Sequence, residues 1–438
     1  MLINWQKYNY AHIVVFLVLY SFSILSFAAK VTYNIDASVT HYDNIDHVLN
    51  PPSDELVEAI TGRVIVLENS ANLVANVNAS VSALHYQKLQ QDELTGELYA
   101  DGLWIIKPKH FEWFTSDVFT QTIIDPLQSN TPSNRQDTNI FSTGPNYYIR
   151  LNKLNNLNLE ARAGRVNYSD TNEDNNRAST AVRWLYQANS AMTDSVNWEV
   201  EKLDFDDASI DDYYKYNLYA RVDYKKARNT FAAEAGITRI DYKKQDDQKG
   251  QRYLVSLESQ RTRNSSIMFR YSHQITDTGA DILSSAGDTS VAPPGLPAVS
   301  GVTTVPVADV YTDDTLSFEY NRTSVSNSLY FEVIQSEQDF KTQNISDQKS
   351  TTVTIVPTYN FSSASSVSLE AYYIKTRFIN VSPLTEDTDT SLKIIYSRKI
   401  TRNKILNFSY EKLMRDSTIS TRNYRDNVVM ILFRYTSI

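Results

Sequence analysis

The feature that most constrains the fold of this chain is a two-residue alternation of apolar and polar side chains that recurs along most of its length. In the segment 73–83 the odd positions are leucine, alanine and valine, and the even positions from 76 onward are asparagine and serine. The segments 216–224 and 316–320 repeat this rhythm. Successive side chains of a β-strand point to opposite faces, and no helical periodicity competes over comparable lengths. The alternation therefore predicts an all-β chain whose strands have one apolar and one polar face.

Three features favour a membrane barrel over a soluble β-sandwich or β-solenoid. The predicted strands are about 9–13 residues long, which suits a tilted crossing of the hydrocarbon, whereas soluble strands average about five or six. The chain also has 29 tyrosines, and tyrosine and tryptophan suit the interface between lipid and water. The apolar faces often finish in such residues, among them Trp104, Trp113, Trp184, Tyr224, Tyr320 and Tyr396.

The third feature is an alternation between two kinds of connection. Short connections such as Lys225–Asn229 and Arg398–Lys404 carry basic residues, whereas longer ones such as Asp204–Asp212 are acidic. Bacterial barrels have short turns in the periplasm, long loops outside and an even number of strands. We therefore predict a single transmembrane antiparallel up-and-down β-barrel of about 18–20 strands, which covers residues 29–438. For the longest connection, Asp277–Thr312, two placements stay open: inside the lumen as a constriction, or outside the barrel.

Residues 1–28 have the features of a secretory signal peptide. Lys7 precedes the apolar run Ile13–Phe27, and Ser26 and Ala28 supply the small residues of a cleavage site before Ala29. A retained N-terminal membrane helix is the alternative, but the apolar run is short for one. The C-terminal strand alternates apolar and aromatic residues, a signal of the type that barrel-assembly machinery reads. We therefore expect the outer membrane of a Gram-negative bacterium, with lipid, lipopolysaccharide and that machinery as partners.

If the apolar set faces lipid, the opposite set faces the lumen, because charged side chains are costly in hydrocarbon. In the functional interpretation, this charged wall selects and orients a hydrated solute. In the structural interpretation, it is a ladder of cross-strand ion pairs that keeps a wide barrel rigid. The predicted lumen-facing residues are Glu160, Arg162, Arg183, Glu199, Arg221, Glu234, Arg252, Glu258, Arg270, Glu319, Glu332, Glu370, Lys393 and Glu411.

The sequence offers little to an enzyme, a metal site or a nucleic-acid binder. The net charge of −9 disfavours binding to a phosphate backbone, and there is no cysteine. There is no GxSxG turn, no HExxH pair and no phosphate-binding glycine motif. The acidic run Asp204–Asp212 lacks the spacing and glycine of a calcium loop, so we expect it to be solvated. We therefore predict no catalytic residue, no cofactor and no metal.

Three stretches near the N-terminus carry a family resemblance: His41–Asp46, Ile106–Trp113 and Asp125–Pro145. Together they resemble outer-membrane β-barrel proteins associated with exopolysaccharide loci that often carry exosortase (PEP-CTERM) systems. The resemblance implies a barrel that assists polymer passage, with a periplasmic polysaccharide-export protein and the polysaccharide as partners. It transfers no catalytic residue. The segment Asp125–Pro145 is expected to be a functional loop or a well-packed Ω-loop, with candidate residues Asp125, Pro126, Thr131, Pro132, Asn134, Gln136, Asn139, Gly144 and Pro145.

Three functions are compatible with these features. The first is assistance to exopolysaccharide export across the outer membrane. The second is a general or substrate-selective diffusion porin that takes solutes inward. The third is a structural or adhesive barrel with a plugged interior. A barrel of about 18–20 strands is wide enough to hold an aqueous lumen rather than a core of side chains.

Overall fold

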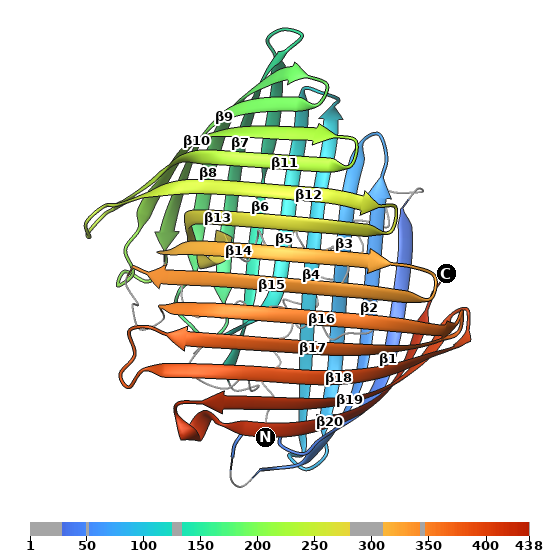
Figure 1. The fold of residues 1–438 in the computed structure, drawn as a ribbon. Coiled ribbons are helices and arrows are strands. Elements are labelled where there is room, and N and C mark those ends of the chain that lie inside the picture. Colours follow the sequence, from blue (N-terminus) through green and yellow to red (C-terminus); the bar gives the residue numbers. More distant parts are fainter. Residues whose placement is uncertain (1–28, 50–51, 125–133, 281–309, 342–346, 438) are drawn as a thin grey trace.

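The computed structural model describes residues 29–49, 52–124, 134–280, 310–341 and 347–437. They form twenty β-strands in a single sheet (Figure 1). The predicted signal peptide lies outside the described residues. The strands are β1 (Lys30–Tyr42), β2 (Glu55–Asn69), β3 (Leu73–Tyr86), β4 (Gln91–Lys107), β5 (Phe111–Ile123), β6 (Arg135–Arg150), β7 (Asn155–Tyr168), β8 (Asn175–Asn189), β9 (Met192–Phe205), β10 (Tyr213–Lys226), β11 (Asn229–Tyr242), β12 (Gln248–Thr262), β13 (Ser265–Asp277), β14 (Val310–Thr323), β15 (Asn327–Phe340), β16 (Gln348–Ser362), β17 (Ser365–Phe378), β18 (Thr385–Thr401), β19 (Lys404–Ser417) and β20 (Tyr424–Thr436).

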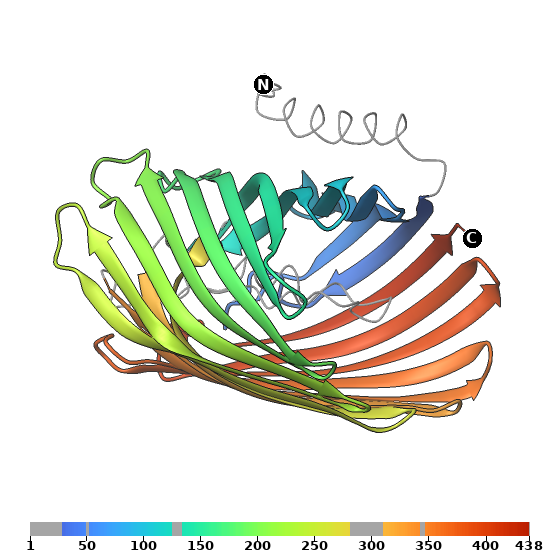
Figure 2. The same ribbon diagram turned by 90° about the horizontal axis from the view of Figure 1, so that it is seen from above.

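The sheet closes on itself. Every strand pairs in antiparallel fashion with the next one along the chain, and β1 pairs with β20 in a register that runs from Asn34↔Thr436 to Tyr42↔Val428. Arg434 of β20 reinforces this seam, because its Nε lies 2.7 Å from Oδ1 of Asp36 in β1. Figure 2 shows the resulting ring of strands. The predicted antiparallel up-and-down barrel is confirmed, at the upper end of the expected strand number.

The strands are longer than predicted. They span 13 to 17 residues, and β18 is one of the longest. The prediction counted only residues in which apolar side chains alternate with polar ones. β18 begins with the polar sequence Thr385–Thr390, which extends the strand toward the long loops. The barrel wall therefore continues past the apolar zone at the end that carries the long loops.

The two faces of the wall differ as the alternation predicts. In β18, Leu392 and Ile394 are exposed on the outer face, whereas Ser391 and Lys393 are buried on the inner face. Among the described residues no helix has the length and apolar character needed to cross a membrane. A closed barrel leaves no strand edge unpaired, which is what hydrocarbon requires of a spanning sheet. The protein is an outer-membrane barrel of a Gram-negative bacterium.

The loop prediction for Asp125–Pro145 is wrong over its second half. β6 begins at Arg135, so Gln136, Asn139, Gly144 and Pro145 lie within a strand. Glycine and proline usually mark turns, and their presence here suggested a loop. Asn134 is a buried residue that directly precedes β6. The remaining candidates, Asp125, Pro126, Thr131 and Pro132, lie outside the described residues.

Candidate functional site

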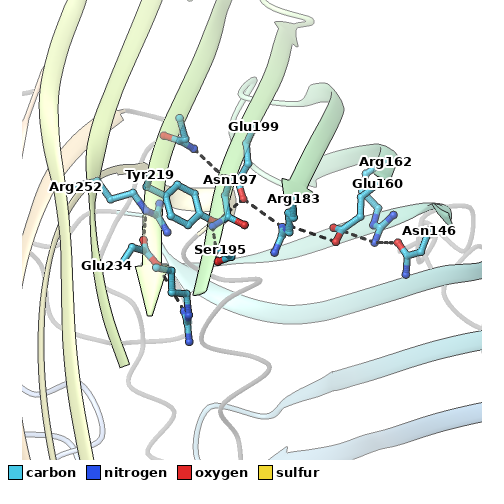
Figure 3. A network of polar contacts seen from close by, with 12 residues as sticks. Asn146, Glu160, Arg162, Arg183, Ser195, Asn197, Glu199, Tyr219, Glu234 and Arg252 are labelled. Carbon is cyan, nitrogen blue, oxygen red and sulfur yellow. Dashed lines mark hydrogen bonds and ion pairs between the residues drawn. The ribbon is translucent and has the colours of Figure 1, made fainter. Parts of the chain in front are cut away.

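A chain of ion pairs and hydrogen bonds crosses the inner wall from β7 to β10. Glu160 of β7 lies between two arginines: its Oε2 is 3.7 Å from Nη2 of Arg162, and its Oε1 is 3.3 Å from Nε of Arg183 in β8. Nη2 of Arg183 then lies 3.2 Å from Oε1 of Glu199 in β9. The Tyr219 hydroxyl of β10 donates to the same Glu199 oxygen at 2.8 Å. Figure 3 shows these side chains pointing toward one another along the wall.

Glu234 of β11 is the centre of a second part of this network. Its side chain is 2% exposed and is shared by two arginines, Arg252 of β12 and Arg221 of β10. The Arg252 guanidinium also lies 4.6 Å above the ring of Tyr219, which links the two parts. The buried carboxylate is therefore neutralised from both sides, as a buried charge requires. We call the full set the charge ladder: Glu160, Arg162, Arg183, Glu199, Arg221, Glu234 and Arg252.

One end of the charge ladder depends on an interruption in the sheet. The pairing of β6 with β7 breaks at Gly144 and Pro145. A Cβ on Gly144 would lie 2.0 Å from the carbonyl oxygen of Ala161, so no other residue fits there unshifted. Arg162 donates from Nη1 to the Pro145 carbonyl at 3.0 Å and from Nη2 to Asn146 Oδ1 at 2.5 Å. Nη1 also donates to the Ala161 carbonyl of β7 at 2.8 Å, so the guanidinium bridges the gap in the ladder, where proline has no N–H to donate.

The other predicted lumen residues lie on different strands. Lys393 of β18 pairs with Glu411 of β19 at 3.2 Å, and Glu370 of β17 stands opposite Lys393 in the register. Glu319 of β14 and Glu332 of β15 stand directly opposite one another. On the two preceding strands, Glu258 of β12 is exposed and Arg270 of β13 stands opposite a serine of β14. The inner wall from β14 to β17 carries a surplus of carboxylates, and we call it the acidic wall.

At the end that carries the long loops, the sheet divides between β12 and β13, while β14 stays paired with β15 up to Tyr311↔Phe340. β12 pairs with β13 only as far as Tyr253↔His273, whereas β13 and β14 stay paired up to Asp277↔Val310. Ile275 and Val310 from this hairpin pack in one cluster with three inner residues of β9, β10 and β11. These three are Leu203, Tyr213 and Ile240. The hairpin end therefore lies inside the barrel, against β9–β11, and we call it the inward hairpin.

Two further contacts fit the inward hairpin to the wall. A Cβ on Gly250 of β12 would lie 2.5 Å from Cδ1 of Ile275, so this glycine makes room for the hairpin. Asp277 forms a buried ion pair with Arg177 of β8, whose side chain is 10% exposed. Arg177 also reaches Glu201 of β9 at 3.4 Å. The start of the longest connection thus points into the lumen, which was one of the two placements left open.

Loops above the inward hairpin are tied to one another by acidic side chains. Asp212, after β9, accepts from the backbone N–H of Phe205 at 2.8 Å and from Lys243 Nζ at 2.6 Å. Burial alone would raise the pKa of Asp212, but these hydrogen bonds outweigh it and hold the pKa below its usual value. The hydrogen bond to Asp212 likewise raises the pKa of Lys243. The acidic run Asp204–Asp212 is therefore hydrogen-bonded to its surroundings rather than purely solvated. We call these hydrogen-bonded loops at the opening of the barrel the mouth.

Metal-ligating side chains do not gather within the part of the chain that the structure describes: no group of three or more could hold an ion there.

Sequence reasoning missed Arg177, Tyr213 and Ile275. Arg177 lies in the polar, loop-side part of its strand, where alternation is weak. Nothing in the sequence links it to Asp277, 100 residues away. The only available signal was the length of the connection Asp277–Thr312.

The similarity of this chain to known proteins is distant. No family model and no curated protein matches this chain. Among solved structures it is similar to the siderophore receptor PirA from Pseudomonas aeruginosa, with 8% identity, 93% of this chain and 80% of that chain covered, and a TM-score of 0.46. It is also similar to Pseudomonas aeruginosa OpdK with vanillate (8% identity, 93% and 99% covered, TM-score 0.40) and to OccK2 (OpdF) in complex with glucuronate (8%, 94% and 98%, 0.41).

Proposed function

We propose that this protein is a diffusion channel for small hydrophilic solutes, with an aperture narrowed by the inward hairpin. The observation that carries the proposal is the position of that hairpin, packed on β9–β11 and paired through Asp277 with Arg177. Barrels of eight strands are filled by their side chains, whereas those of about 16–18 strands hold a water channel. Twenty strands therefore enclose more space than side chains alone fill.

The charge ladder is the part of the wall that would orient a solute. The side chains of Arg183 and Arg221 are each 36% exposed, so their guanidinium groups are accessible from the lumen although both are paired. A solute carboxylate can share these donors with Glu199 and Glu234, because a guanidinium has five N–H groups. The acidic wall supplies the opposite charge elsewhere in the lumen. This arrangement favours a small solute that carries a carboxylate over a neutral one.

Single-channel recording in planar bilayers tests the channel itself. The purified full chain is expected to give discrete conductance steps in potassium chloride. Gly250→Val places a side chain where Ile275 lies, so it is expected to displace the hairpin and raise the conductance. Adding Ile275→Ala makes room again and is expected to restore the original step. Gly62→Val is the matched control, because nothing lies within 4 Å of a Cβ at Gly62.

The absence of any conductance step in the full chain and in Gly250→Val would overturn the channel and favour a plugged structural barrel. A conductance that does not change in Gly250→Val would leave a channel but remove the hairpin as its constriction. The two outcomes therefore separate the function from its proposed gate.

Reversal potentials across a salt gradient test the charge ladder. Replacing Arg183 and Arg221 with glutamine removes two positive charges and leaves Glu160 and Glu199 in place. We expect the permeability ratio to shift toward cations. The opposite shift is expected when Glu319 and Glu332 on the acidic wall become glutamine. Equal reversal potentials in both double variants would contradict a solute-facing role for these residues.

Polysaccharide export, which the resemblance implies, remains the alternative. None of the contacts among the described residues favours a polymer over a small solute. Comparing extracellular with periplasmic polysaccharide in a deletion strain distinguishes the two functions. Loss of extracellular polymer with periplasmic accumulation would support export, whereas unchanged polymer with reduced solute uptake would support the channel.

A further inference from the structure

The two ends of the barrel carry opposite charge. None of the short turns contains an aspartate or glutamate, and several contain lysine or arginine. These turns are residues 70–72, 108–110, 151–154, 190–191, 227–228, 263–264, 324–326, 363–364 and 402–403. In the described long loops acidic residues dominate, as in 169–174 and 206–212. Since short turns of such barrels face the periplasm, the periplasmic end is the basic one.

Part of this basic charge lies on the outer face, directly beside the aromatic residues. In three strands a tyrosine that points toward lipid is followed, two residues later, by a lysine or arginine on the same face. The pairs are Tyr224 with Lys226 in β10, Tyr320 with Arg322 in β14, and Tyr396 with Arg398 in β18. All three basic residues are exposed. The phase is set by exposed outer residues of the same strands: Leu218, Phe318 and Ile394.

The spacing places these charges at the level of the lipid headgroups. Two residues along a strand cover about 7 Å, and the tyrosines mark the edge of the hydrocarbon. Lys404 of β19 continues the same band, because it precedes the exposed outer residue Phe408 in phase. No ion pair joins any of these four residues to a carboxylate in the part of the chain that the structure describes. Their charge is available to an outside partner.

We propose that this band, Lys226, Arg322, Arg398 and Lys404, binds the phosphate groups of anionic phospholipids in the periplasmic leaflet. Arginine and lysine form strong charge-assisted hydrogen bonds to phosphate oxygens. The band faces the bilayer below an aromatic belt rather than the water beneath the turns, which favours a lipid over an acidic periplasmic protein. It lies on one half of the barrel, β10–β19, so the bound lipids form an arc rather than a ring.

Native mass spectrometry of the full chain released from nanodiscs tests this assignment. The nanodiscs contain equal parts of phosphatidylglycerol and phosphatidylcholine. We expect phosphatidylglycerol to be enriched among the retained lipids. The triple variant Lys226→Gln, Arg322→Gln, Arg398→Gln is expected to reduce that enrichment, by up to about fivefold for each charge at the membrane surface.

A matched control removes three charges from the same end but from the inner face. Lys225 and Lys399 are sequence neighbours of Lys226 and Arg398 and point to the opposite face, as does Arg150 of β6. The variant Arg150→Gln, Lys225→Gln, Lys399→Gln is expected to keep the enrichment. Unchanged enrichment in the outer triple variant, or equal losses in both variants, would overturn the proposal. Both variants preserve the charge ladder and the inward hairpin, so single-channel conductance confirms that the barrel is intact.

Discussion

The charge ladder on β7–β12 and the acidic wall on β14–β17 differ in whether their carboxylates have basic partners. In the charge ladder, acids and bases alternate across neighbouring strands, so that Glu234 is held by both Arg221 and Arg252. On the acidic wall two carboxylates, Glu319 and Glu332, stand opposite one another. Opposite charges across a strand pair stabilise a sheet, and like charges destabilise it. The first arrangement favours rigidity, whereas the second leaves charge available to the lumen.

The largest effect is expected from a substitution at the most buried carboxylate of the charge ladder. Glu234→Ala leaves two guanidinium groups without their shared carboxylate. Removing one partner of a buried ion pair costs about 3–5 kcal/mol of unfolding free energy. Urea unfolding of the barrel in lipid vesicles measures this loss. Glu258→Ala, at an exposed carboxylate of β12, is the control and is expected to change stability little. Equal effects of the two substitutions would remove the distinction between buried and exposed members of the inner wall.

The second effect tests the interruption at the edge of the charge ladder. Gly144→Ala adds a Cβ that meets the Ala161 carbonyl, so β6 or β7 has to shift and Arg162 loses its aligned acceptors. Overpacking of this kind costs about 1–3 kcal/mol. Gly62→Ala in β2 is the control, because its Cβ meets nothing within 4 Å. Hydrogen exchange of the β6 and β7 amides should accelerate only in the first variant.

A smaller effect of opposite sign is expected on the acidic wall. Glu332→Gln removes one of the two facing carboxylates and its repulsion with Glu319. Stability should rise by about 0.2–1 kcal/mol, measured by the same urea unfolding. A loss of stability instead would mean that these carboxylates are held by favourable contacts, and the contrast between the two walls would fail.

The smallest effect concerns the mouth above the charge ladder. The pKa of Asp212 is lower in the folded protein than its usual value. Its bonds to Lys243 and Phe205 therefore stabilise the mouth above the unfolded-state pKa, and this contribution is lost as the pH falls through the folded-state pKa. Hydrogen exchange of the loops after β9 and β11 should rise at acidic pH. In Asp212→Asn the same loops should exchange faster at neutral pH and respond less to acidification.

Much of the inner wall could be predicted from sequence, because the face on which a strand residue lies follows from the two-residue alternation alone. Once the apolar face was assigned to lipid, the phase of Glu160, Arg183 and Glu199 followed, and the structure joins these three in one chain of ion pairs. The part of β6 from Arg135 to Pro145 was assigned to a loop because the turn signals at Gly144 and Pro145 are local. Their compensation by Arg162 comes from another strand.

The inward hairpin could not be predicted for a related reason. Its position depends on packing between Ile275 and side chains of β9–β11 and on the pair Arg177–Asp277, which are contacts between segments distant in sequence. A sequence pattern reports which face of a strand a residue occupies. It does not report where two neighbouring strands part.

The β1–β20 seam has a consequence for the kinetics of folding. Asp36 and Arg434 are 398 positions apart, so almost the whole polymer has to be arranged before they meet. Contacts of such high order form slowly, because the entropy of closing the intervening chain is lost before they form. Until then β1 and β20 are both unpaired edges, the parts of a nascent sheet most prone to aggregation. The seam is therefore the step whose timing decides between a soluble aggregate and a closed cylinder.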